Sequence, residues 1–268
     1  MQRECRYVPL SKQPLILVLC QVRISPVRKI ADYIPAIQEE FRRHGYPIER
    51  SGKIQQVNIG PNGVQTTEQE RWEFRSKEET WSIIVLQDSF VLQTTAYSKF
   101  EEFAGQLKLA ASTILSKTEH EEFGRLHRIG LRYIDLIQPR DGEDFRYYLR
   151  PGFHGLSDNV FKKGTGRIRV ECVGKTDFGE TEGTMIARIA QNDQGLDLPP
   201  DLAGSAPQKQ QRSKVGELVT FIDLDHYVEG NFDPDLNWLE KTVFLLHDQI
   251  IESFHNHVIT QEALEVWK

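Results

Sequence analysis

Cysteine is scarce in this sequence, and long apolar runs are missing. The three cysteines, Cys5, Cys20 and Cys172, lie far apart and form no Cys-x-x-Cys pair, so we predict neither a structural zinc cluster nor a redox dithiol. We expect Cys20 and Cys172 to be small buried residues of apolar strands in a reducing cytoplasm. The longest apolar run, Leu15 to Cys20, is too short to span a bilayer and ends without a cleavage-site pattern. We therefore expect a soluble cytoplasmic protein.

An excess of positive charge is also missing. The 33 lysines and arginines are outnumbered by 39 aspartates and glutamates, which gives a formal net charge of −6. This balance does not favour nucleic-acid phosphates or an anionic membrane as partners. The sequence has no phosphate loop and no Gly-x-Ser-x-Gly elbow, and its glycine pairs at 164–166 and 179–183 are typical of hairpin turns. No cofactor is expected from these patterns.

The sequence does contain an order of elements that occurs twice. In each round an apolar strand is followed by a helix, several alternating strands and a long amphipathic helix. The first round comprises a strand at 16–24, a helix at about 30–44, strands between 54 and 97, and a helix from 98 to about 116. The second comprises a strand at 128–137, a short helix at 144–149, strands between 167 and 225, and a helix at about 235–257.

Three helix starts carry their own signals. Ser98-x-x-Glu101 matches a capping box, and Asp233-Pro234 predicts a helix with aspartate as its cap and proline in its first turn. Thr260 is expected to cap a short final helix that ends at Trp267.

The repeated order predicts an α+β fold in which long helices cover one face of antiparallel sheets. Tandem halves of the TATA-binding-protein-like type have this layout, and a single helix-grip sheet around the last helix is the alternative. We expect an N-terminal half at 1–120 and a C-terminal half at 121–268, the second with a flexible loop at 191–215. The uncovered sheet face, or the groove between the halves, would remain for binding.

The closest approach to a catalytic group is Asp223-x-Asp225-His226 at the end of a predicted strand. Alternation places the two carboxylates on one face, about 7 Å apart. They could hold a divalent cation, with Asp135 or Glu171 as a third ligand. The interpretation that we favour is structural pairing, since opposite charges on neighbouring strands commonly face one another. The arginines available for it are Arg23, Arg132 and Arg169.

Two further segments could bind ligands. Arg146, Tyr147 and Arg150 combine basic and aromatic side chains that could stack on a nucleotide, although an amphipathic helix with snorkelling arginines has the same composition. Near the C-terminus, helical spacing allows a metal site, but a solvated helix end is the better interpretation. The residues concerned are His247, Asp248, Glu252, His255 and His257.

Segments spread over nearly the whole chain resemble one protein family. They are 14–24, 34–39, 45–47, 72–76, 94–97, 128–133, 221–226 and 254–260. The family is a sporadically distributed prokaryotic group of similar length with no assigned function. The resemblance implies no catalytic residues, and the patchy distribution is associated with accessory systems such as defence or toxin–antitoxin modules.

These observations favour a non-enzymatic binding or interaction protein, whose partner is a protein encoded nearby or a second copy of the chain. One alternative is a metal-dependent enzyme acting on phosphoesters through its strand carboxylates. Its residues would be Asp135, Asp223, Asp225 and His226. The other is a small-molecule sensor with a pocket under the last long helix, lined by Trp238, Phe221 and Tyr227.

Overall fold

The computed structural model describes residues 10–60, 63–140, 142–156, 160–161, 166–179, 181–195, 198–199, 202, 207 and 213–268, with backbone alone at 54–60 and 63–67. The strands are β1 (Leu15–Ile24), β2 (Ile48–Gly60), β3 (Gly63–Arg75), β4 (Trp81–Val85), β5 (Ser89–Thr94), β6 (Leu126–Ile137), β7 (Arg169–Asp177), β8 (Glu182–Gln194) and β9 (Val215–Phe232). The α-helices are α1 (Ile30–Arg43), α2 (Phe100–Lys117), α3 (His120–Phe123), α4 (Leu236–Ser253) and α5 (Gln261–Trp267). Shorter turns are the 3-10 helices η1 (Phe145–Tyr147) and η2 (Pro151–Phe153) and the π-helix η4 (Phe254–Val258).

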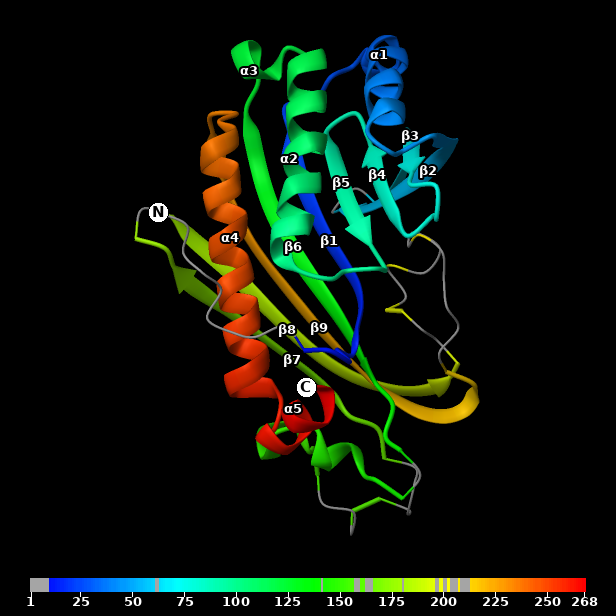
Figure 1. Cartoon of the computed structure of the whole chain (residues 1–268), viewed down its shortest axis with the longest axis vertical. Coiled ribbons are helices and arrows are strands. Elements are labelled where there is room, and N and C mark those ends of the chain that lie inside the picture. Colours follow the sequence, from blue (N-terminus) through cyan, green and yellow to red (C-terminus); the bar gives the residue numbers. More distant parts are fainter. Residues whose placement is uncertain are drawn as a thin grey trace. The chain divides into compact units, whose positions relative to one another are not determined.

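The strands form one nine-stranded sheet in the order β2-β3-β4-β5-β1-β6-β9-β8-β7. The hairpin of β2 and β3 and the pairs β3–β4, β4–β5, β7–β8 and β8–β9 are antiparallel. Figure 1 shows the sheet with its long helices. The predicted α+β class is thus confirmed. No helix in the described part of the chain is long and apolar enough to cross a membrane.

The chain forms two compact units. Unit 1 comprises Met1–Val18, Gly130–Val228 and Val243–Lys268, and unit 2 comprises Leu19–Ile129 and Glu229–Thr242. The expected halves at 1–120 and 121–268 stay a prediction. Of the expected flexible loop, residues 191–194 belong to β8 and Val215 begins β9, while most of the segment lies outside the described residues.

In unit 2 one sheet face is covered by α1 and α2. The amphipathic α1 buries Ile30, Ile34, Ile37 and Phe41, and the ring of Phe41 lies 5.2 Å from that of Phe74 on β3. The helix α2 packs on α1 and on β5. Because Phe74 points to the helices, its neighbours Glu73 and Arg75 point to the opposite side of the sheet.

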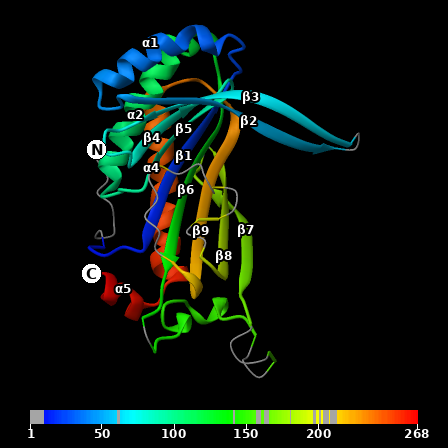
Figure 2. The same cartoon turned by 90° about the vertical axis from the view of Figure 1, so that its right-hand side faces the viewer.

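In unit 1 the corresponding cover is α4, which Figure 2 shows along one side of β6, β9 and β8. The Tyr133 hydroxyl on β6 is hydrogen-bonded to Nδ1 of His247 on α4 at 2.8 Å. Nδ1 of His226 on β9 donates to the Leu246 carbonyl at 3.3 Å. We call this side the helix face and the opposite side, in either unit, the far face.

Two of the three predicted helix starts are wrong. The helix α2 begins at Phe100 with Lys99 at the N-cap and no side-chain cap, because the Ser98 hydroxyl is bonded to the Glu102 carboxylate instead. The cap of α4 is Asp235, which accepts from the N–H groups of residues 237 and 238, while Asp233 pairs with Arg125. The Thr260 cap is confirmed, since its hydroxyl accepts from the Ala263 N–H.

The two described cysteines differ, and Cys5 lies outside the described residues. Cys20 on the central β1 is buried as expected, and burial raises the pKa of its thiol to about 12. Cys172 is exposed, so its predicted burial is wrong. The reason is the position of its strand: β7 is the last strand of the sheet and has a neighbour on one side alone.

Candidate binding surface on the far face of the sheet

The four residues of the enzyme hypothesis are divided between the two faces in unit 1. Asp135 is two positions beyond Tyr133 on β6 and therefore shares the helix face with His226. Asp223 and Asp225 alternate with His226 on β9 and therefore point to the far face. The structure thus brings Asp223 and Asp225 together but separates them from the other two by the thickness of the sheet.

Asp223 is held by two arginines on the adjacent strands. Nε and Nη2 of Arg132 on β6 donate to its two carboxylate oxygens, each at 2.7 Å. Arg188 on β8 stands directly opposite Asp223 in the register and lies 3.4 Å from it. The predicted ion pair between Asp223 and Arg132 is therefore present in the structure. The second partner, Arg188, was not predicted, because the register of two strands cannot be read from the sequence.

The ion pairs continue to the edge of the sheet. Nε of Arg188 donates to the Glu171 carboxylate at 2.6 Å, so charges alternate across β6, β9, β8 and β7. Burial lowers the pKa of Arg188. The hydrogen bond that Arg188 donates to Glu171 and the negative charge of Asp223 outweigh this effect, so the net change in the pKa is upward. Each guanidinium in this ladder has a carboxylate neighbour, which accounts for the burial of the charged side chains of Arg132 and Asp223.

The helix face of unit 1 holds its ionisable groups without charge at neutral pH. Burial raises the pKa of Asp135 to about 8, and no hydrogen bond or ion pair joins this carboxyl to another residue in the described part of the chain. Burial lowers the pKa of His226 to about 4. Since Nδ1 of His226 donates to a carbonyl, its Nε2 accepts from the Thr176 hydroxyl at 2.7 Å.

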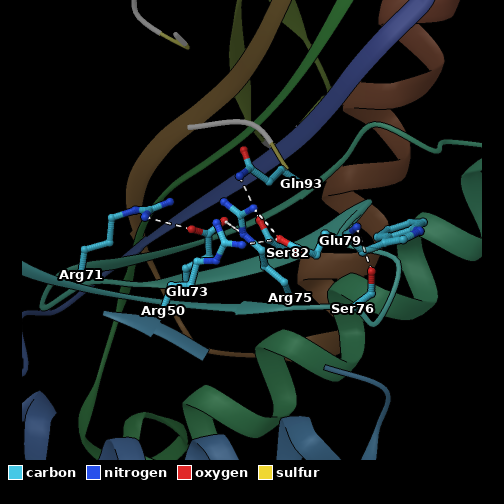
Figure 3. A network of polar contacts seen from close by, with 9 residues as sticks. Arg50, Arg71, Glu73, Arg75, Ser76, Glu79, Ser82 and Gln93 are labelled. Atoms are coloured by element: carbon cyan, nitrogen blue, oxygen red, sulfur yellow. Dashed lines mark hydrogen bonds and ion pairs between the residues drawn. The ribbon is translucent and has the colours of Figure 1, made fainter. Parts of the chain in front are cut away.

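In unit 2 the far face carries a denser polar network on β3 and its neighbours (Figure 3). The carboxylate of Glu73 receives Arg75 Nε at 2.8 Å on one oxygen and lies 3.0 Å from Arg71 Nη1 on the other. Glu79 lies 3.1 Å from Arg75 Nη1 and 2.6 Å from Arg50 Nη2. We call Arg50, Arg71, Glu73, Arg75 and Glu79 the arginine cluster.

Neighbouring strands hold the arginine cluster from one side. Ser82 on β4 stands opposite Arg75 in the register, and its hydroxyl accepts from the amide of Gln93 on β5 at 2.9 Å. Glu73, Ser82 and Gln93 are each at most 1% exposed. Burial lowers the pKa of Arg75, but the hydrogen bonds that its guanidinium donates to Glu73 and Glu79 outweigh this effect, and the net change is upward. The cluster is therefore permanently charged. Glu73 and Arg75 are shielded from water, whereas the Arg50 side chain is 53% exposed.

The arginine cluster has one positive charge more than it has negative charges. Three guanidinium groups share two carboxylates, and Nη2 of Arg71 is buried with no hydrogen-bond acceptor in the part of the chain that the structure describes. Leaving a charged donor without an acceptor costs more than the 1–3 kcal/mol that is typical of neutral groups. The sequence contained a partial signal for this site, because Arg71-Trp-Glu-Phe-Arg75 alternates charged and aromatic residues.

The segment with Arg146, Tyr147 and Arg150 forms 3-10 turns in place of the expected short helix. Arg146 pairs with Asp144 and lies 5.3 Å from the ring centre of Phe145, while Tyr147 is exposed. The Arg150 N–H donates to the Val258 carbonyl, and its Nε is buried with no hydrogen-bond partner among the described residues. These contacts tie the segment to the C-terminal region of unit 1 and show no stacking platform formed by all three side chains.

The remaining candidates are also dispersed. His247 points to the sheet, where burial lowers its pKa to about 3, and His257 is exposed. In the described part of the chain, no three histidine, cysteine, aspartate or glutamate residues are placed to hold a metal ion. Of the sensor residues, Trp238 lies 4.4 Å from the ring of Phe232 in unit 2, whereas Phe221 and Tyr227 point to the far face of unit 1.

Comparisons with known proteins add no identity to this geometry. The sequence matches no protein-family model, and no curated protein matches it significantly.

Proposed function

We propose that the chain is a non-enzymatic protein-binding module, and that the arginine cluster on its far face receives a carboxylate group of the partner protein. The observation that carries this proposal is the charge of the cluster: three arginines share two glutamates, Nη2 of Arg71 has no hydrogen-bond acceptor among the described residues, and the Arg50 guanidinium belongs to a side chain that is 53% exposed. A carboxylate from a partner would accept from this group and balance the extra charge. Its two oxygens match the fork of donors that a guanidinium presents.

The geometry of unit 1 supports binding over hydrolysis. Asp223, the central residue of the enzyme hypothesis, already accepts two short hydrogen bonds from Arg132. Asp135 and His226 lie on the other side of the sheet. The resemblance of the sequence segments further suggests an accessory system, such as a defence or toxin–antitoxin module, as the setting.

We propose in addition that the chain is an internal duplication with a TATA-binding-protein-like layout. The sheet order supports this, because it reads alike outward from the neighbouring strands β1 and β6. From β1 the order is β5, β4, β3 and an additional β2 at the edge, and from β6 it is β9, β8, β7. In each half the first strand, β1 or β6, lies next to the last strand, β5 or β9. That last strand is followed along the chain by a long helix, α2 or α4.

The test is native mass spectrometry of the protein purified gently from its own host, followed by binding measurements with each co-purified protein. Arg71→Gln removes one positive charge of the arginine cluster together with the Nη2 donor, and it should weaken binding of the partner at least tenfold. The matched control is Lys53→Gln on the same hairpin. Lys53 stands opposite Glu70, which shares the helix side with Phe74, so this charge is lost from the other face.

Binding that is equally strong in both variants would contradict the assignment of the surface. Cleavage of bis(p-nitrophenyl) phosphate with Mg²⁺ or Mn²⁺ that disappears in Asp223→Asn would contradict the non-enzymatic proposal itself.

A further inference from the structure

We propose that β7 is a self-complementary edge strand, through which two copies of the chain associate by antiparallel pairing centred on Val173. The strand is the last of the sheet and pairs with β8 on one side, and among the described residues no strand pairs with the backbone N–H and C=O groups of its other side. Seven of its nine residues are exposed, all except Val170 and Thr176, and Val173 is 63% exposed. An apolar residue at the middle of an open edge is a natural point of association.

The order of charges along β7 singles out one register. Antiparallel pairing about Val173 places Arg169 opposite Asp177 of the second copy and Glu171 opposite its Lys175. Symmetry repeats both pairs, so four opposite-charge pairs flank a central contact between the two valines. The five residues of β7 that take part in these pairs occupy alternate positions of the strand and therefore all lie on the far face.

The neighbouring registers that keep the faces aligned are unfavourable. Centring the pairing on Cys172 places Arg169 opposite Lys175, and centring it on Gly174 places Glu171 opposite Asp177. Centring the pairing on Glu171 or on Lys175 places two glutamates or two lysines, one from each copy, directly opposite one another. Like charges directly opposite one another destabilise a strand pair, so the Val173 register is selected among them.

The helix-face row of β7 is compatible with the same register. It brings Val170 opposite Thr176 and Cys172 opposite Gly174, which combines β-branched or small residues and no charge. Within one copy, Glu171 forms an ion pair with Arg188, and Lys175 forms one with Glu182. The side chains of Glu171, Lys175 and Glu182 are nevertheless each more than half exposed. Those charges therefore remain accessible to a second copy.

The experiment is a sedimentation equilibrium dilution series at low salt. Because one strand pair is a small interface, we expect a dissociation constant on the order of micromolar. Val173→Asp places two carboxylates at the symmetry axis and should weaken the dimer at least tenfold. The matched control, Val215→Asp, makes the same change at a valine that is 83% exposed outside β7 and should leave the dimer unchanged.

A charge swap tests the register itself. Arg169→Asp should weaken the dimer, because it faces Asp177, and adding Asp177→Arg to the same chain should restore it. Arg169 has no ion pair in the described part of the chain, so the swap leaves the ladder intact. A wild-type protein that stays monomeric throughout the series would overturn the proposal. So would a dimer that none of the β7 variants weakens, or a double variant that stays as weak as the single one.

Discussion

In unit 1 the two faces of the sheet bury ionisable groups in opposite electrostatic states. On the helix face, burial alone moves the pKa of Asp135 to about 8 and that of His247 to about 3, so both groups are uncharged at pH 7. On the far face, Asp223 is 3% exposed and lies among arginines. The comparison teaches that water exclusion neutralises an isolated group, while a counter-charge on the next strand preserves the charge.

The largest effect is expected from breaking the far-face pairing. Asp223→Asn should lower the free energy of unfolding by about 3–5 kcal/mol, because Arg132, with a side chain that is 12% exposed, loses its bidentate carboxylate. Urea unfolding at pH 7 measures this change. In Glu171→Gln, where the carboxylate is 54% exposed, the loss should stay below about 1 kcal/mol. Equal losses in the two variants would show that burial does not set the strength of the ladder.

The opposite sign is expected on the helix face. The pKa of Asp135 is raised by burial, so the folded state binds this proton more tightly, and stability falls as the pH rises from about 4 to about 8. Asp135→Asn removes this penalty and should stabilise the protein at pH 8 by about 3 kcal/mol, roughly half the full linkage value. Unfolding measurements at pH 5 and pH 8 test this, and a gain that is the same at both values would contradict it.

The buried histidines should produce a smaller change in acid. The folded-state pKa of His226 is lowered to about 4, so stability is present above pH 6.5 and is lost as the pH falls towards 4. His226→Gln should reduce this acid loss by about 2 kcal/mol. Asp135 lowers stability throughout the range from about pH 4 to about pH 8, but below pH 6.5 the two buried histidines, His226 and His247, together outweigh it. Melting temperatures of the wild type should therefore be highest near pH 6.5. A flat profile would contradict the assignment.

The smallest effect on stability concerns the cysteines. In a Cys5→Ser background, a maleimide should label Cys172 in the folded protein and Cys20 only after unfolding, because Cys20 is buried and its pKa is raised to about 12. Cys172→Ser should change the free energy of unfolding by less than about 0.5 kcal/mol. Rapid labelling of both thiols in the native protein would show that β1 is not the buried centre of the sheet.

The elements themselves were predictable because their signals are local. The apolar run of β1 and the helical spacing of Phe103, Leu107 and Ile114 in α2 appear in the structure as buried positions. The cap of α4 was misplaced from Asp235 to Asp233, because two aspartates flank Pro234 and the ion pair with Arg125 engages Asp233. The exposure of Cys172 could not be predicted, since an edge strand and a central strand share the same alternation.

The sequence by itself determined the α+β class, the bounds of β1, β6 and the long helices to within a few residues, and the alternation that puts Asp223 and Asp225 on one face. These follow from periods of 2 and 3.6 residues and from turn and cap chemistry. Only the tertiary structure decided that Arg188 and Arg132 flank Asp223, that Asp135 is uncharged, and that Arg71 has a donor without an acceptor. Those properties depend on strand order, register and burial, which arise from contacts between residues far apart in the chain.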